Sequence, residues 1–273
     1  MQQLLFDNQV RLKRFFLTLP AAIAVMYAGG VFWFNQKIPT YSSRIKGLTG
    51  HAVYLAAPQD LTELQIDARI MGTPPNYWQA ISALSAVQSA LTAYPESPLR
   101  QSGPALVLAG DVTLLGVEVG GTVQTPNVVI LATRYMFGGL GTRDLKNTFH
   151  HEYSSILLRE YVFPAEAWRD TLPDGFSFPE TDSERLAATQ VYADDLREYH
   201  QLGFVSDYGA SSFENDVNTY AELLMGDPAR LKQLSDQYAK IRAKKELILK
   251  FYVGINPDFV QRFRGAGLFD LSE

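Results

Sequence analysis

The hydrophobic positions of the chain follow a strand-like pattern in part of its first half. Short apolar runs at 105–109, 112–119 and 127–132 are separated by Gly-Asp, Gly-Gly and Thr-Pro pairs. Runs of this length with turn residues between them are typical of β-strands joined by tight turns. Another short run, at 52–56, predicts one further strand. We therefore expect a β meander over 105–132, preceded by a separate strand.

Other segments repeat their apolar residues every three or four positions, as amphipathic helices do. This pattern predicts a helix over 77–94 that ends before Pro95, a second over 144–161 and a third over 183–199. A strand region followed by helices indicates an α+β fold.

The last part of the chain is predicted to be helical as well. Residues 228–251 read as a charged helix. Its basic side chains are expected to lie mostly in solvent, namely those of Lys240, Arg242, Lys244, Lys245 and Lys250. Segment 251–269 is rich in aromatic residues, and we expect it to dock on the domain.

The N-terminal region carries a long apolar run. Residues 15–34 contain no charged side chain, and a helix of this length can cross the ~30 Å hydrocarbon core of a bilayer. The basic residues at 11–14 favour a cytoplasmic N-terminus. An uncleaved transmembrane anchor, a cleaved signal peptide and a buried helix of a soluble protein all remain open. We therefore divide the chain into an anchor or signal segment, 1–36, and one domain, 37–273.

Composition excludes several classes of function. The formal net charge is −5 and the calculated pI is about 5.5, which gives no electrostatic footprint for nucleic acid. The chain has no cysteine, so disulfides, thiolate metal sites and cysteine nucleophiles are excluded. Only four histidines occur in the sequence. A metal ion would therefore have to be held by these imidazoles together with carboxylates.

A sequence motif of metal-dependent hydrolases lies within the predicted helix 144–161. His151, Glu152 and Ser155 form H-E-x-x-S, which differs from the zinc motif H-E-x-x-H only at its last position. In the intact motif two histidines on one helix face bind Zn²⁺, and the glutamate acts as general base. A serine hydroxyl is a weak, neutral ligand. Without the second motif described next, His150 and His151 would read as ordinary half-buried histidines of an amphipathic helix.

A second motif follows at 203–224, where Tyr208-Gly209 precedes an acidic helix start at Glu214-Asn215-Asp216. In their order and separation the two motifs resemble the gluzincin-like zinc-binding metallopeptidases of bacterial envelopes, over roughly residues 105–230. The resemblance implies a zincin-like mixed sheet over an active-site helix, followed by a helical subdomain. It also implies a zinc cofactor, a peptide or protein substrate, and a location in the bacterial cell envelope, either anchored in the membrane through the N-terminal helix or secreted to the periplasm.

The resemblance also implies roles for individual residues. His151 corresponds to the first zinc ligand, Glu152 to the general base and Tyr208 to the donor that stabilises the oxyanion. Ser155 and Asn215 stand where the second and third ligands are expected.

Three hypotheses of different classes follow. In the first, a divergent zinc peptidase recruits His150, Glu214 or Glu222 as replacement ligands. In the second, a pseudo-peptidase retains the cleft and binds an extended peptide or a glycan without cutting it. In the third, the chain is a structural protein of the envelope.

Overall fold

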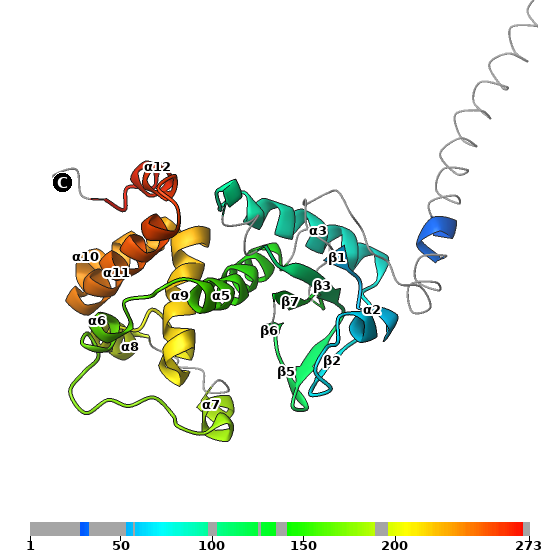
Figure 1. The fold of residues 1–273 in the computed structure, drawn as a ribbon, viewed down its shortest axis with the longest axis horizontal. Coiled ribbons are helices and arrows are strands. Elements are labelled where there is room, and N and C mark those ends of the chain that lie inside the picture. Colours follow the sequence, from blue (N-terminus) through cyan, green and yellow to red (C-terminus); the bar gives the residue numbers. More distant parts are fainter. Residues whose placement is uncertain are drawn as a thin grey trace, which may run out of the picture.

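A computed structural model describes residues 28–32, 53–56, 58–97, 103–124, 127–134, 141–188 and 196–269. Within these residues the protein combines a mixed β-sheet, a smaller antiparallel sheet and a large helical part (Figure 1). The predicted α+β class is confirmed. The strands are β1 (Val53–Tyr54), β2 (Ile70–Gly72), β3 (Ala105–Ala109), β4 (Val112–Leu114), β5 (Val117–Glu118), β6 (Gly121–Gln124) and β7 (Val128–Ala132).

The larger sheet has the strand order β1-β3-β7-β6, and the smaller sheet has the order β2-β4-β5. Strands β1, β3 and β7 run parallel to one another, whereas β6 runs antiparallel to β7. In the smaller sheet both pairings are antiparallel.

The predicted β meander is wrong. The run 112–119 divides into β4 and β5 and joins the smaller sheet, while β3 and β7 become parallel neighbours. The Gly120-Gly121 pair, predicted to be a turn, instead leads directly into β6. Local pattern could not reveal this arrangement, because β6 is short, begins with glycine and is defined by its partner rather than by its own hydrophobicity.

The positions of the helices were predicted more closely than the pairing of the strands, because helical periodicity depends only on neighbouring residues. The predicted helix over 77–94 is confirmed as α3, and that over 144–161 as α5. The predicted helix over 228–251 is two helices, α10 and α11, separated at Tyr238, and within 183–199 the structure describes the end of α7 and the start of α8. The helices are α2 (Pro58–Glu63), α3 (Tyr77–Leu91), α5 (Thr142–Glu160), α6 (Ala165–Arg169), α7 (Asp182–Ala188), α8 (Arg197–Leu202), the 3-10 turn η2 (Tyr208–Ser211), α9 (Phe213–Gly226), α10 (Pro228–Gln237), α11 (Ala239–Ile255) and α12 (Phe259–Gly265).

The larger sheet separates two hydrophobic cores, because alternate residues of a strand face opposite sides. On β3, Leu106 and Leu108 face the main core, which includes α3, α5 and α9. Val107 and Ala109 face a smaller core, which Ile70 of β2 helps to cover.

Helix α5 lies in the middle of the molecule, between the sheet and α9 (Figure 1). Its buried aromatic residues, Phe149 and Tyr153, contact Tyr94 edge-on. Phe259 of α12 also packs edge-on against Tyr94. The prediction that the aromatic C-terminal segment docks on the domain is therefore confirmed over α12, where Phe259 and Phe263 are fully buried.

A buried ion pair fixes α9 from the side of α11. Lys244 and Asp216 are both fully buried, and Lys244 Nζ lies 2.6 Å from Asp216 Oδ2. Trp168 Nε1 donates to the same oxygen at 2.8 Å, and Lys244 Nζ also donates to the carbonyl oxygen of Gly203 at 3.0 Å. Burial raises the pKa of Asp216 to about 6, against the opposing effect of Lys244.

The expectation that Lys244 and Lys245 lie in solvent is wrong, because these positions face the helices that pack on α11.

The predicted membrane segment falls mostly on residues that the structure does not describe. Residues 1–27 and 33–36 lie outside the described ranges. Among the described helices, none has both the length and the apolarity needed to span a bilayer.

Lys244→Met is predicted to destabilise the protein by roughly 3–5 kcal/mol, because it leaves the Asp216 carboxylate buried without its cation. Urea unfolding of the variant measures this free energy. Lys250→Met is the matched control, since Lys250 is exposed on the same helix and its replacement should change stability by less than about 0.5 kcal/mol. Equal stabilities for the two variants would contradict the structural role of the pair.

Candidate functional site

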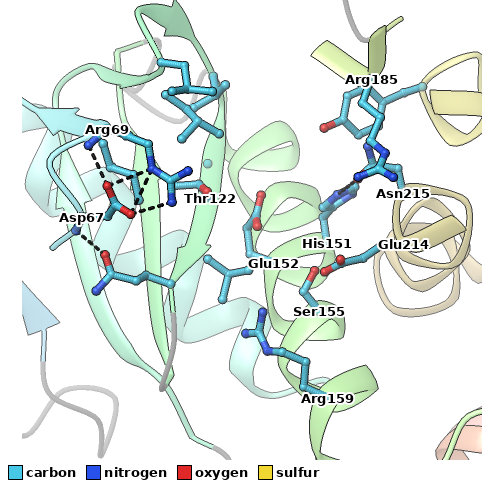
Figure 2. A pocket seen from close by; sticks show the side chains of 18 residues that line it. Asp67, Arg69, Thr122, His151, Glu152, Ser155, Arg159, Arg185, Glu214 and Asn215 are labelled. Atoms are coloured by element: carbon cyan, nitrogen blue, oxygen red, sulfur yellow. Dashed lines mark hydrogen bonds and ion pairs between the residues drawn. The ribbon is translucent and has the colours of Figure 1, made fainter. Parts of the chain in front are cut away.

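A cavity of about 540 Å³ lies between the strands and the helices (Figure 2). Its floor is formed by α5, from which Glu152, Ser155 and Arg159 point into the cavity. Strand β6 and the smaller sheet form one wall, and the opposite wall includes Tyr208 and the start of α9. Both sequence motifs therefore meet at one cavity.

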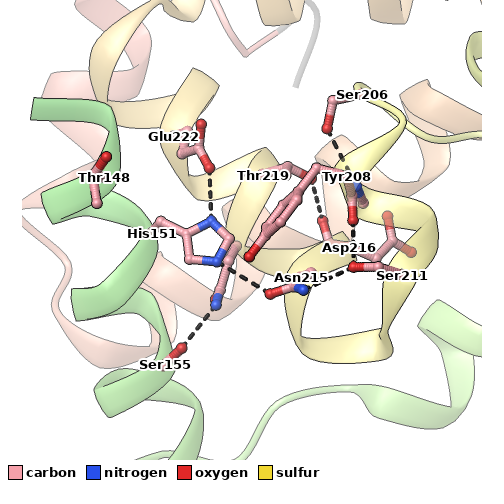
Figure 3. Close-up of polar contacts among 12 residues, drawn as sticks. Thr148, His151, Ser155, Ser206, Tyr208, Ser211, Asn215, Asp216, Thr219 and Glu222 are labelled. Atoms are coloured by element: carbon pink, nitrogen blue, oxygen red, sulfur yellow. Dashed lines mark hydrogen bonds and ion pairs between the residues drawn. The ribbon is translucent and has the colours of Figure 1, made fainter. Parts of the chain in front are cut away.

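His151 connects α5 to α9 through both of its ring nitrogens (Figure 3). Nδ1 lies 2.7 Å from Oε1 of Glu222, and Nε2 lies 3.2 Å from Oδ1 of Asn215. The ring of Tyr208 stands next to the imidazole, with 5.5 Å between the ring centroids. The structure thus brings together four residues singled out in the sequence, from α5, η2 and α9.

The surroundings of His151 favour its charged form. Burial lowers the pKa of His151, but the hydrogen bond and charge of Glu222 outweigh it, with smaller contributions from Glu152 and Asn215, and raise this pKa to about 9. At neutral pH the ring is therefore an imidazolium. Since both nitrogens of an imidazolium carry a proton, His151 donates to Glu222 and to Asn215 together.

The surroundings of Glu152 favour its uncharged form, because burial of a carboxyl group raises its pKa. Burial, together with the nearby charges of Glu214 and Glu222, raises the pKa of Glu152 to about 7, although His151 and Arg159 act against it. Both protonation states are therefore populated near neutral pH. The side chain lines the cavity and can donate or accept a hydrogen bond there.

Gly121 allows β6 to approach this part of α5. A Cβ atom added at Gly121 would lie 2.6 Å from Cγ2 of Thr148 and 3.3 Å from Cγ of Glu152. Any larger residue would push the strand away from the helix. The close approach places the β6 backbone beside the Glu152 side chain.

Ser155 and Asn218 contact one another beside His151. Asn218 Nδ2 donates to Ser155 Oγ at 2.7 Å, and both side chains are buried. The sequence motifs did not identify Asn218. Its position four residues before Glu222, on the same face of α9, is the signal that relates it to the site.

The donors at this position do not fit a zinc ion. Both nitrogens of His151 are engaged by protein side chains, and Ser155, Asn215 and Asn218 offer only neutral oxygen donors. Zinc sites in proteins are built from imidazole, thiolate and carboxylate ligands. Among the described residues no group of three or more His, Asp or Glu side chains is arranged to hold a metal ion.

His150 faces away from the cavity, although it was considered as a replacement ligand. It is almost fully buried, and its Nδ1 lies 3.0 Å from the hydroxyl of Tyr94. Burial, with smaller effects of Arg262 and Lys146, lowers the pKa of His150 to about 3. Glu214, in contrast, is exposed and lines the cavity.

Strand β6 leaves one edge unpaired within the described part of the chain. The hydrogen bond from Ala132 N to Gly120 O, 2.8 Å long, sets the alternation of the ladder between β6 and β7. By this alternation the N–H and C=O groups of Gly121 and Val123 point away from β7. The side chain of Gln124, at the end of β6, accepts from the backbone N–H of Asp67 at 2.6 Å and donates to the carbonyl oxygen of Gln65 at 3.0 Å.

Comparison of the chain with protein-family models, with curated proteins and with solved structures gave no match. The site is therefore interpreted from its own residues and geometry.

The pKa of His151 is predicted to be about 9 in the native protein and to fall to its ordinary value of 6.5 or below in Glu222→Gln, which removes both the charge and the strong hydrogen bond. NMR titration of the histidine rings measures both values. His150 is the internal control, since its pKa of about 3 keeps it neutral throughout. An unchanged titration of His151 in the variant would contradict the pairing.

Stability should follow the same titration. Because the pKa of His151 is raised on folding, its contribution is complete below pH 6.5 and is lost as the pH rises to about 9. The loss is on the order of 3 kcal/mol. Unfolding free energies measured across this range should fall in the native protein and stay nearly level in Glu222→Gln.

Proposed function

We propose that the protein is a non-catalytic pseudo-peptidase, a zincin-like envelope protein that binds an extended peptide along the free edge of β6. The observation that carries the proposal is the position of this unpaired edge beside the cavity on α5. A peptide that pairs with β6 obtains main-chain hydrogen bonds, while its alternate side chains reach the cavity walls.

The polar floor of the cavity supports binding rather than metal-dependent hydrolysis. Asn218 donates to Ser155, and His151 is held by Glu222 and Asn215. The imidazole and carboxylate ligands that a catalytic zinc ion needs are therefore not assembled here. Glu152 is free to exchange its proton near neutral pH. It can accept from a peptide N–H when ionised and donate to a peptide carbonyl when protonated.

The proposal keeps the location expected from the sequence. With residues 1–36 as a membrane anchor or signal segment, the domain would face the outside of the cytoplasm, where its ligand would be an exported or surface peptide. The arrangement of a mixed sheet, a motif helix and a following helical part is consistent with the zincin resemblance.

Binding can be tested with a fluorescein-labelled positional-scanning library of acetylated decapeptide amides, followed by fluorescence anisotropy. We expect a subset of sublibraries to bind, and mass spectrometry should show the peptides intact with or without added zinc. N-methylation of alternate residues provides the control. In one register it should weaken binding about tenfold or more, because those amides pair with β6, and in the other it should have little effect.

Two outcomes would contradict the proposal. Cleavage of the peptides with added zinc would favour the divergent peptidase. Binding of cell-wall oligosaccharides, with no binding of any peptide sublibrary, would favour the glycan alternative.

The donor set predicts weak zinc binding in the native protein. Ser155→His adds a second imidazole four residues from His151, and Asn218→Glu adds a carboxylate where the two native side chains now touch. The double variant should bind zinc at least about a hundredfold more tightly than the native protein by isothermal titration. Ser155→Ala with Asn218→Ala is the control without donors. Tight binding of one zinc by the native protein would show that other residues supply the ligands.

A further inference from the structure

The hairpin between β4 and β5 contains a residue in an unfavourable backbone conformation. Its two-residue turn is Leu115-Gly116, and both residues have positive φ, +54° and +81°. Turns of this kind favour Asn-Gly, since a side chain that is not short and polar is strained in the left-handed region. Glycine suits the second position. Leucine at the first is strained.

Packing within the protein does not offset this strain. The Leu115 side chain is 54% exposed, so it obtains little of the stabilisation that burial of a leucine gives. The turn is nevertheless fixed in position, because the N–H of Leu115 donates to the carbonyl oxygen of Arg69 at 2.9 Å. Residues held in strained backbone conformations cluster at active and ligand-binding sites, where the surrounding structure fixes them.

Leu115 also lines the cavity, together with other apolar side chains of the smaller sheet. Ile70 of β2 and Leu114 of β4 are paired neighbours in the sheet and lie on the same wall. We call the set of Ile70, Leu114, Leu115 and Val119 the hairpin wall. The hairpin wall is apolar, whereas the floor of the cavity on α5 is polar. The wall therefore favours an apolar part of a ligand, and the floor favours a polar part.

We propose that the hairpin wall, with Leu115 at its tip, selects an aliphatic or aromatic side chain of the peptide bound along β6. This inference rests on the proposed function. The peptide backbone pairs with Gly121 and Val123, and one of its apolar side chains covers Leu115. Burial against the ligand then supplies the stabilisation that the free hairpin lacks. The ligand class is an extended peptide with a large apolar residue.

Leu115→Asn gives a test in which stability and binding change in opposite directions. Asn tolerates positive φ, so the Tm should rise by about 2 °C. The same change removes the apolar contact, so anisotropy titrations with the decapeptide sublibraries that fix Leu, Ile, Phe or Met should show binding about tenfold weaker. Sublibraries that fix polar residues at that position should be unaffected.

Two further variants distinguish loss of the Leu115 contact from a general effect of substitution on folding or binding. Leu115→Ala retains the strained conformation and removes most of the side chain, so it should weaken binding without raising the Tm. Val162→Asn changes an apolar residue that is 97% exposed and does not line the cavity, and it should alter neither binding nor apolar preference.

The outcomes distinguish the inference from the function on which it rests. Peptide binding with no apolar preference, or with full affinity in Leu115→Asn, overturns the role of the hairpin wall and leaves strand pairing intact. If no sublibrary binds the native protein, both proposals fail. The assignment is supported if Leu115→Asn and Leu115→Ala lose the apolar preference and the control Val162→Asn keeps it.

Discussion

The polar contact between α5 and α9 fixes the arrangement on which the site depends. His151 is held from both ring nitrogens by side chains of α9, and Ser155 meets Asn218 one turn further along α5. Such buried side-chain hydrogen bonds are strong in a medium of low dielectric, and an unpaired partner would be costly. The two helices therefore have one favourable register. That register decides where η2 places Tyr208 and where the cavity opens.

Helix α9 is fixed from its other side by a buried charge. Asp216 and Asn215 are neighbours in sequence but face different surroundings, since Asp216 joins Lys244 and Trp168 in the core while Asn215 faces His151. Removing the charge of Lys244 would leave a buried carboxylate, so the network constrains the helix strongly. The wall of the cavity is thus positioned by interactions of residues that do not themselves line the cavity.

The chemistry of the cavity combines a polar helix surface with an open strand edge. Gly121 brings β6 close to Glu152, and the hairpin wall lies across the cavity from α9. Hydrogen bonds of Ser155 with Asn218 and of Asn215 with His151 occupy the place where the sequence resemblance implies metal ligands. Under the proposed function, the strand edge would hold the peptide backbone by hydrogen bonds and the hairpin wall would provide discrimination.

The sequence by itself determined the features that depend on local spacing. Helices α3 and α5 followed from apolar periodicity, which is local. The two motifs singled out His151, Glu152 and Tyr208, and the structure places all three in the lining of one cavity. Tertiary structure decided the remainder. Four features depend on which distant segments meet: the parallel pairing of β3 with β7, the position of β6 at the edge of the described sheet, the burial of Lys244 and the contact of Ser155 with Asn218. Those pairings are set by the packing of whole elements against one another, which no local pattern of residues encodes.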